Sequence, residues 1–332
     1  MCDPDITIVL CTYNRPEMLR NALRSIIDQE TGGAFSYEIV VIDNASTEPT
    51  RIAVAEIAAT SRVPVRYVRE EAKGLAQAYN RGVREARGTW LAFFDDDQLA
   101  EPNWLKELLT AATVTKAKVV GGDRRLDLPT GNSLVLGPTS RNILGEHGFS
   151  GEARICQGKR LPAGGNILIA RQLFEAIGIF DTSMLGAGED SDFVRRARAS
   201  GAIVSISPEA IVHHVIPPYR LAPSYLRWNS MRWGHCFAHI DYKNSGRPGM
   251  FVCFAARVGQ ALLVNLPLLI LAALTRNTVE SLDRQCLLWR AIGYAGGAAS
   301  LAAPGLFKQG RVFSGLDLRE ERTRFSHSQS LR

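Results

Sequence analysis

Apolar and polar stretches alternate along the first hundred residues in lengths typical of strands followed by helices. Short runs rich in branched and aromatic side chains occupy residues 6–11, 37–42, 63–68 and 90–94. The segment after the first run spaces Leu19, Leu23, Ile26 and Ile27 as a helix would, and Pro16 suits its start. Strands that alternate with helices predict an α/β fold with a doubly wound, mostly parallel sheet.

Polar residues follow three of these four runs. They read "CTYNR" after the first, "DNAS" after the second and "DDD" after the fourth. In parallel sheets, ligands bind at the carboxyl ends of the strands. A solvated turn would explain any one of these clusters, but it would have to apply separately to all three. We therefore expect them to converge on one ligand site.

The last cluster contains three adjacent carboxylates, Asp95, Asp96 and Asp97. Neighbouring carboxylates repel one another, and a buried charge without a partner is costly. Solvent, a basic side chain or a bound cation has to compensate them.

Other mononucleotide-binding folds fit poorly. The chain has no GxxxxGK[ST] loop, and no GxGxxG follows its first strand. A haloacid-dehalogenase-like phosphatase also places DxD after an apolar strand. It would need Thr or Val two residues after the second Asp and would usually open the domain with this motif, whereas Leu99 stands here, deep in the chain.

Composition and charge narrow the class further. The six cysteines are scattered without a CxxC pair, and the acidic start "MCDPDITIVLC" does not resemble a signal peptide, so we expect a cytosol-facing protein. Residues 1–216 carry a net charge of −3 and residues 217–332 a net charge of +9. An acidic front half does not suit nucleic-acid binding, and a basic rear half suits an anionic membrane surface.

The rear half contains two apolar segments, 258–274 and 291–307, near the lower length limit of a membrane-spanning helix. They predict a hydrophobic helical hairpin that associates with the membrane; whether it spans the bilayer stays open. The expected division is therefore a catalytic domain over 1–216, an acceptor-side linker over 217–250, the hairpin over 251–310 and a disordered basic tail over 311–332.

Four motifs together resemble the GT-A-fold glycosyltransferases of family 2. They are "IVLCTYNRPEMLRNALRSI", "EIVVIDNAS", "GLAQAYNRGVREARGTWLAFFDDDQLAEPNWL" and "FDTSMLGAGEDSDFVRRARASGA". The resemblance covers residues 5–215 in the family's order. The later stretch "SISPEAIVHHVIPPYR" is similar to bacterial exopolysaccharide transferases of the succinoglycan glucosyltransferase kind.

The resemblance implies a nucleotide-sugar donor held with Mn²⁺ or Mg²⁺. Asp97 would bind the metal, and Asp95 would face the ribose and the metal. One of His213 and His214, with His213 favoured, would complete the shell or meet the diphosphate. Asp43 would accept a hydrogen bond from uracil, although helix capping is an alternative role. The remaining donor-site residues would be Thr12, Tyr13, Arg15, Lys73, Asn80 and Asp96.

For the acceptor side, the resemblance makes Asp190 the catalytic base of an inverting displacement, with Asp192 as its rival. Glu189, Gly165, Asn166, Arg232 and Trp233 would contact the acceptor. The stretch "NSMRW" places Asn229 where processive synthases have Gln in QxxRW, which favours transfer of a single sugar.

We therefore expect a metal-dependent glycosyltransferase at the cytoplasmic face of the inner membrane. It would move a sugar, from UDP in preference, to a lipid-linked saccharide. One alternative is a sugar nucleotidyltransferase, but "CTYNRPEM" lacks the Gly-rich basic loop of that class. A non-catalytic sugar-nucleotide-binding partner in a membrane assembly is the other.

Overall fold

The computed structural model describes residues 3–47, 49–158, 161–162, 164–183 and 188–304. The chain forms two compact units. The first comprises Met1–Asp127 and Glu146–Val215, and the second comprises Leu128–Gly145 and Ile216–Arg332. The longer segment of the second unit starts at Ile216, next to the expected domain boundary after residue 216. The second unit also contains residues 128–145, which the sequence analysis assigned to the catalytic domain. The tail 311–332 lies outside the described residues.

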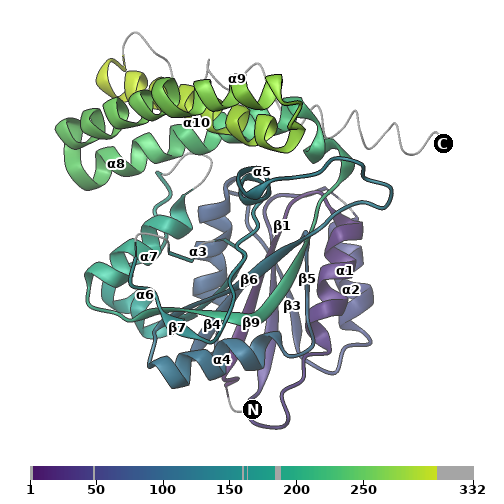
Figure 1. The fold of residues 1–332 in the computed structure, drawn as a ribbon. Coiled ribbons are helices and arrows are strands. Elements are labelled where there is room, and N and C mark those ends of the chain that lie inside the picture. The colour runs from purple at the N-terminus through teal and green to yellow at the C-terminus, as the bar shows by residue number, and fades with distance from the viewer. Residues whose placement is uncertain (1–2, 48, 159–160, 163, 184–187, 305–332) are drawn as a thin grey trace. The chain divides into compact units, whose positions relative to one another are not determined.

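A mixed sheet of nine described strands forms the centre of the first unit (Figure 1). Its strands are β1 Ile6–Thr12, β2 Tyr37–Asp43, β3 Val65–Arg69, β4 Trp90–Asp95, β5 Gln98–Ala100, β6 Val119–Asp127, β7 Arg154–Ile155, β8 Asn166–Ala170 and β9 Val204–Val215. They lie in the order β3-β2-β1-β4-β8-β6-β9-β5, with β7 beside β9.

The first four strands are parallel, as the sequence predicted, and each lies within two residues of its expected bounds. The rest of the sheet is mixed. β8 runs antiparallel to both β4 and β6, while β6 and β9 are parallel to each other. The register pairs Thr12 with Asp43 and Cys11 with Asp95. The polar clusters after β1, β2 and β4 therefore meet at one edge of the sheet.

Helices cover both faces of this sheet (Figure 1). α1 (Pro16–Ile27), α2 (Thr50–Ala58) and α4 (Trp104–Thr115) pack on one face, and α3 (Leu75–Glu85), α6 (Arg171–Ile177) and α7 (Glu189–Ala199) pack on the other. Alternate side chains of β1 serve the two layers: Ile8 and Leu10 enter the first core, and Val9 enters the second. Both faces are apolar, which explains why the strands read as continuous apolar runs.

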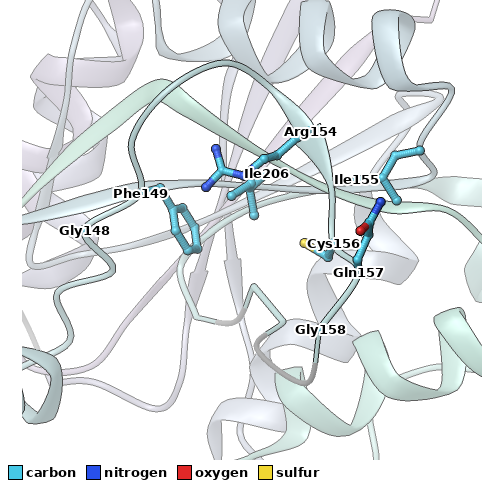
Figure 2. A pocket seen from close by; sticks show the side chains of 8 residues that line it. All are labelled: Gly148, Phe149, Arg154, Ile155, Cys156, Gln157, Gly158 and Ile206. Carbon is cyan, nitrogen blue, oxygen red and sulfur yellow. The ribbon is translucent and has the colours of Figure 1, made fainter.

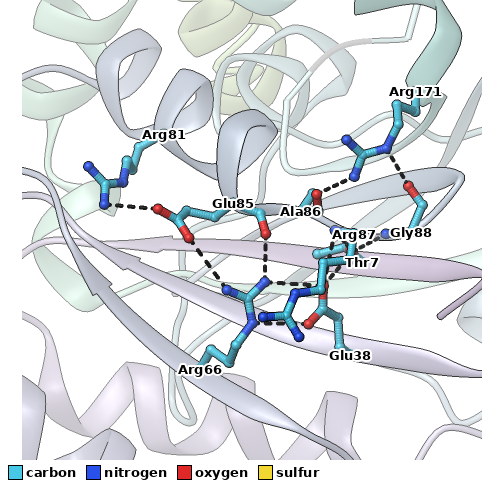
Figure 3. A network of polar contacts seen from close by, with 9 residues as sticks. All are labelled: Thr7, Glu38, Arg66, Arg81, Glu85, Ala86, Arg87, Gly88 and Arg171. Carbon is cyan, nitrogen blue, oxygen red and sulfur yellow. Dashed lines mark hydrogen bonds and ion pairs between the residues drawn. The ribbon is translucent and has the colours of Figure 1, made fainter. Parts of the chain in front are cut away.

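A buried polar network anchors the opposite edge, where the strands begin (Figure 3). Glu38 is almost fully buried and receives hydrogen bonds from Thr7 Oγ1 at 2.9 Å and Arg66 Nε at 3.0 Å. Burial acts to raise the pKa of Glu38, but the bonds from Arg66 and Thr7 outweigh it and bring the pKa below its usual value. The ion pair thus ties β1, β2 and β3 together at the end of the sheet remote from the polar clusters.

The second unit is helical. It contains α5 (Pro138–Ile143), the 3₁₀ helix η1 (Pro218–Leu221), α8 (Pro223–Gln260), the π-helix η2 (Ala261–Asn265), α9 (Leu266–Leu274) and α10 (Thr278–Ala302). Gly246 breaks α8 with a φ of 64°. α8 and α10 pack at backbone distance, because a Cβ on Gly234 would lie 2.0 Å from Arg290 O and one on Gly293 would lie 2.0 Å from Met231 O.

The two apolar segments differ in the structure. Residues 258–274 fall in α8, η2 and α9 and expose Leu263, Ile270 and Leu274. The stretch Pro223–Leu274 is long and apolar enough to cross a membrane by length and composition. The second segment begins in α10, whose Tyr294 and Ala298 are buried against the unit's other helices, and its last residues lie outside the described part.

Candidate active site

Asp95 ends β4 at the edge where the three polar clusters meet. Tyr79 of α3 donates a hydrogen bond to Asp95 Oδ1 at 3.1 Å, and Gln98 Nε2 lies 3.5 Å from Oδ2. Burial and then the neighbouring Asp97 raise the pKa of Asp95 to about 6, against the opposing effect of Arg124. In the described part of the chain, the buried Gln98 Oε1 has no hydrogen-bond partner. Carboxylate and amide oxygens in such surroundings fit a hard divalent cation.

Asp96 and Asp97 share one arginine. Arg15 NH1 lies 2.7 Å from Asp96 Oδ1 and 3.0 Å from Asp97 Oδ2, and Thr12 Oγ1 donates to Asp96 Oδ2 at 2.8 Å. Thr12, Arg15 and Asp96 therefore lock the loop after β1 to the loop after β4. These bonds engage the three side chains with one another, and their expected contacts with the donor stay predictions.

The glycine pair before β8 approaches this site closely. A Cβ at Gly165 would lie 2.2 Å from Asp95 Cγ, and one at Gly164, whose φ is +86°, would lie 2.4 Å from Arg124 NH2. The glycines thus admit the Asp95 carboxylate and the Arg124 guanidinium. Gly165 lies at the site as expected from the sequence. Its neighbour in the structure is Asp95, whereas the sequence analysis expected it to contact the acceptor sugar.

The two histidines of β9 point in different directions. His214 Nε2 lies 3.5 Å from Asp97 Oδ2, whereas His213 Nε2 lies 3.1 Å from Glu101 Oε1. Successive side chains of a strand face opposite sides of the sheet, so only one of the two can reach the carboxylates. The structure therefore replaces His213 with His214 as the histidine of the site. Among the described residues, no three His, Cys, Asp or Glu side chains are grouped as a complete metal cage.

Asp43 lies buried at the end of β2. Its Oδ1 accepts from Ser46 N at 2.8 Å, and its Oδ2 accepts from Tyr67 Oη at 2.6 Å. The alternative role as a helix cap is wrong, because α2 begins at Thr50 after Pro49. Asp43 instead closes the tight turn that follows its strand. Tyr13 is half-buried in the neighbouring loop after β1.

Two asparagines expected at the site are structural. Asn80 exchanges two hydrogen bonds of 2.9 Å with the backbone of Phe180. Asn166 is fully buried: it accepts from Trp104 Nε1 at 2.7 Å and donates to Asp123 O and Ala210 O. Both amides are buried and bonded within the fold, which does not favour a direct contact with a sugar or a nucleotide. Lys73 is exposed just before α3.

The first turn of α7 carries the second acidic pair. Glu189 is buried and Asp190 is half-buried. Burial raises the pKa of Tyr79, and the charges of Asp95, Cys11, Asp190 and Glu189 add to this effect. The pair on α7 therefore shares one electrostatic neighbourhood with Asp95. Asp192, the rival base, is bound by Arg196 Nε at 2.8 Å. In the described part of the chain, Asp190 uses only Oδ1, which accepts from Ser191 N at 2.6 Å.

A pocket of about 580 Å³ opens on the β7 side of the sheet (Figure 2). It is lined by Gly148, Phe149, Arg154, Ile155, Cys156, Gln157, Gly158 and Ile206. His147 connects it to the carboxylate site. Its Nδ1 lies 3.2 Å from Gly122 O, its Nε2 lies 3.1 Å from Arg124 NH2, and its ring centroid lies 5.1 Å from that of Phe149.

Arg232 and Trp233 belong to the second unit. Arg232 Nε donates to Asn229 Oδ1 at 3.1 Å, and its guanidinium lies 5.3 Å from the Trp228 ring. Asn229 is buried and donates to Ile143 O at 2.8 Å. Trp233 meets Phe237 edge to face. Asn229 thus fixes both the arginine of the "NSMRW" motif and the end of α5.

Sequence reasoning missed three residues of the site, Tyr79, Gln98 and Arg124, and it favoured His213 over His214. The helical spacing around Tyr79 marks it as a core residue, which it also is. Nothing local distinguishes Arg124 within its strand or Gln98 after the carboxylates. The adjacent pair His213–His214 was the only visible signal for a histidine.

Comparisons with known proteins agree with this fold. The model of the family "Glycosyl transferase family 2" matches residues 7–178. The succinoglycan biosynthesis protein ExoM of Rhizobium meliloti is 28% identical over 239 residues, which is 71% of this chain and 74% of that protein. The chain therefore belongs to glycosyl transferase family 2, and it resembles glycosyltransferases of exopolysaccharide biosynthesis.

Solved structures confirm the GT-A-like fold. The mannosyltransferase PcManGT of Pyrobaculum calidifontis, in complex with GDP-Man and Mn²⁺, has a TM-score of 0.59 at 19% identity. The match covers 89% of this chain and 88% of that one. TarS of S. aureus, residues 1–349 in complex with UDP, has a TM-score of 0.50 at 15% identity and covers 90% and 91%.

Proposed function

We propose that this protein transfers one sugar, with inversion, from a nucleoside diphosphate to a lipid-linked saccharide in cell-surface polysaccharide synthesis. The observation that carries the proposal is the pair of carboxylates Asp95 and Asp97 at the end of β4, with the acidic pair Glu189 and Asp190 in the same electrostatic neighbourhood. An electrophile held by the first pair would meet a base from the second.

A divalent cation, Mn²⁺ or Mg²⁺, fits the first pair. Asp97 and Asp95 supply oxygen ligands, and His214 takes the place expected of His213. Such ions use few protein carboxylates and complete their shell with phosphate and water. When bound, the ion would neutralise the diphosphate leaving group. The chain's own part is to fix the carboxylates: Tyr79 holds Asp95, and Arg15 holds Asp97 against Asp96.

Asp43 and Tyr13 would receive the nucleotide base, since they lie at the adjoining ends of β2 and β1. The proposed donor is a UDP-sugar. Solved relatives of this fold are complexed with UDP in one case and with GDP-Man and Mn²⁺ in another, so the base preference is part of the test. Lys73, exposed before α3, would border the donor.

Asp190 would act as the catalytic base. An acceptor hydroxyl is a weak nucleophile and needs a group that takes its proton within hydrogen-bond reach. Asp190 keeps one carboxylate oxygen without a partner in the described part of the chain, whereas Arg196 engages Asp192. Glu189 and the pocket beside Phe149 are the proposed acceptor contacts.

The exposed apolar surface of η2 and α9 would bind the cytoplasmic face of the membrane. Leu263 and Leu274 are 80% and 78% exposed, and this unit is basic. Apolar side chains flanked by arginines favour an anionic lipid interface. A lipid-linked acceptor would be presented at that surface.

The test compares the wild type with Asp190→Asn in a membrane extract supplied in turn with radiolabelled UDP-sugars and GDP-sugars. We expect at least a hundredfold slower transfer in the variant, with unchanged UDP affinity. The matched control is Asp28→Asn, an exposed carboxylate at the end of α1. Full transfer by Asp190→Asn would remove the assigned base, and no transfer by the wild type with any nucleotide sugar would remove the proposed activity.

A further inference from the structure

The helical unit carries more cations than its carboxylates can balance. Over residues 128–145 and 216–304 it has ten Lys and Arg residues and three Asp and Glu residues. Fixed positive charge of this kind calls for an anionic partner. Two of these arginines, Arg257 and Arg290, lie close to each other within the unit.

Each of the three acids already has a defined role. Asp283 accepts hydrogen bonds of 2.8 Å from Thr139 N and Ser140 N and so caps α5. Glu280 pairs with Arg284 at 2.7 Å. Asp241 accepts from Tyr294 Oη at 2.9 Å and lies 3.5 Å from Arg257 NH2. Each acid in the described part of this unit is therefore already engaged within it.

Arg257 lies between two aromatic rings. Its guanidinium carbon is 4.6 Å from the centre of Tyr294 and 5.3 Å from that of Phe237. The rings hold the guanidinium plane in place, and Asp241 takes one of its nitrogens. In the described part of the chain its Nε is buried and has no hydrogen-bond partner. The fixed fork of this arginine is therefore only partly used.

Arg290 lies one helical turn before Tyr294 on α10, on the same side of the helix. It is half-buried, and its side chain forms no hydrogen bond or ion pair with any described residue. Burial lowers the pKa of Arg290, and the nearby charge of Arg257 lowers it further. Two arginines that repel each other thus lie near one another, and Asp241 pairs with Arg257 alone among them.

This arginine pair adjoins the exposed apolar surface. Arg257 directly precedes residues 258–274, and within that segment Leu262, Leu263, Ile270, Leu271 and Leu274 are all more than half exposed. A hydrocarbon chain on this surface would bring an anionic head group to the arginines. Guanidinium groups bind phosphate oxygens in pairs, which makes phosphate the chemistry that fits best.

We propose that Arg257 and Arg290 form a binding site for the phosphate or diphosphate of the lipid that carries the acceptor saccharide. The inference rests on the proposed lipid-linked acceptor and adds the residues that recognise its head group. Arg257, whose side chain is 32% exposed, offers the part of its guanidinium that Asp241 does not engage, and Arg290 offers its guanidinium. The dianion would supply the counter-charge that Arg290 lacks among the described residues. Bulk anionic phospholipid would satisfy the charge but would gain nothing from the pairing of the two forks.

The test measures binding of the full chain to three kinds of vesicle. They are phosphatidylcholine alone, phosphatidylcholine with a few per cent of a long-chain polyprenyl diphosphate, and phosphatidylcholine with phosphatidylglycerol at the same surface charge. We expect the wild type to bind the polyprenyl diphosphate vesicles about tenfold more tightly than the phosphatidylglycerol ones. Arg257→Gln and Arg290→Gln should each lose this preference.

Controls separate the site from general charge and from folding. Arg247→Gln removes an exposed arginine of α8 and should keep the preference. Arg257→Lys keeps the charge but loses the fork, so it should bind both anionic vesicles equally. Equal binding of the wild type to both, or an unchanged preference in the Gln variants, would overturn the proposal. UDP binding by the same samples reports on the transferase proposal independently.

Discussion

The hydroxyl of Tyr79 donates a hydrogen bond to Asp95 Oδ1 across 3.1 Å, and it connects a helix of one sheet face to the carboxylates at the end of β4. Tyr79 is 2% exposed and packs edge to face on Phe93, with 5.0 Å between ring centres. The core therefore fixes the position of the hydroxyl, and the hydroxyl fixes the carboxylate.

Replacing Tyr79 with Phe should weaken metal-dependent nucleotide binding about tenfold. The ring and its packing stay, but the buried carboxylate of Asp95 loses a donor, and hydrogen bonds to charged groups contribute about 1.5–3 kcal/mol. Calorimetric titration with UDP and Mn²⁺ measures the effect. Tyr37→Phe, which removes a hydroxyl bonded to Ile27 O, is the matched control. Unchanged affinity in Tyr79→Phe would show that this bond does not position Asp95.

Gly165→Ala should abolish nucleotide binding while the protein stays folded. The new Cβ would lie 2.2 Å from Asp95 Cγ and would displace the carboxylate. Gly259→Ala, where a Cβ meets nothing within 4 Å, serves as the control. Circular dichroism checks folding, and fluorescence titration with a UDP analogue checks binding. A variant that binds the analogue normally would contradict the close approach described here.

Between the two histidines of β9, only His214 should matter for the metal. His214→Ala should raise the Mn²⁺ concentration needed for half-maximal UDP binding about tenfold or more, as loss of a ligand or its support typically does. His213→Ala removes the neighbour that faces Glu101 and should behave as the wild type. The reverse pattern would return the role to His213.

Arg66→Met should lower the free energy of unfolding by about 2 kcal/mol, because it leaves the buried Glu38 without its cation. This loss is smaller than for a fully buried ion pair, because Arg66 is partly exposed to solvent. The folded-state pKa of Glu38 lies below 4.5, so its contribution is present above pH 4.5 and is lost as the pH falls through the folded pKa. Urea unfolding from pH 7 to 3 should show the two proteins converging in acid. A constant gap would contradict the assignment.

The parallel half of the fold was predictable because its information is local. Each of β1 to β4 is a continuous apolar run, and both faces of the sheet are covered. The antiparallel insertion of β8 between β4 and β6 was not predictable, since strand direction depends on where the chain returns and not on the run itself.

The same distinction explains which polar residues the sequence could bring to one edge of the sheet. Thr12, Asp43 and Asp95 follow apolar strands, so topology alone brings them to one edge. Asn80 and Asn166 looked like ligands because isolated polar residues near glycines often are. Their partners lie up to a hundred residues away, at Phe180 and Trp104, and no local pattern contains such contacts.

The most direct test of the central claim is calorimetric binding of UDP, with and without Mn²⁺, to the wild type, Asp97→Asn and the exposed control Asp127→Asn. If the carboxylates at the end of β4 hold the metal, UDP should bind the wild type and the control at least tenfold more tightly with Mn²⁺ than without it. Asp97→Asn should lose this increase in affinity. UDP binding that does not depend on Mn²⁺, or a metal effect that survives in Asp97→Asn, would contradict it.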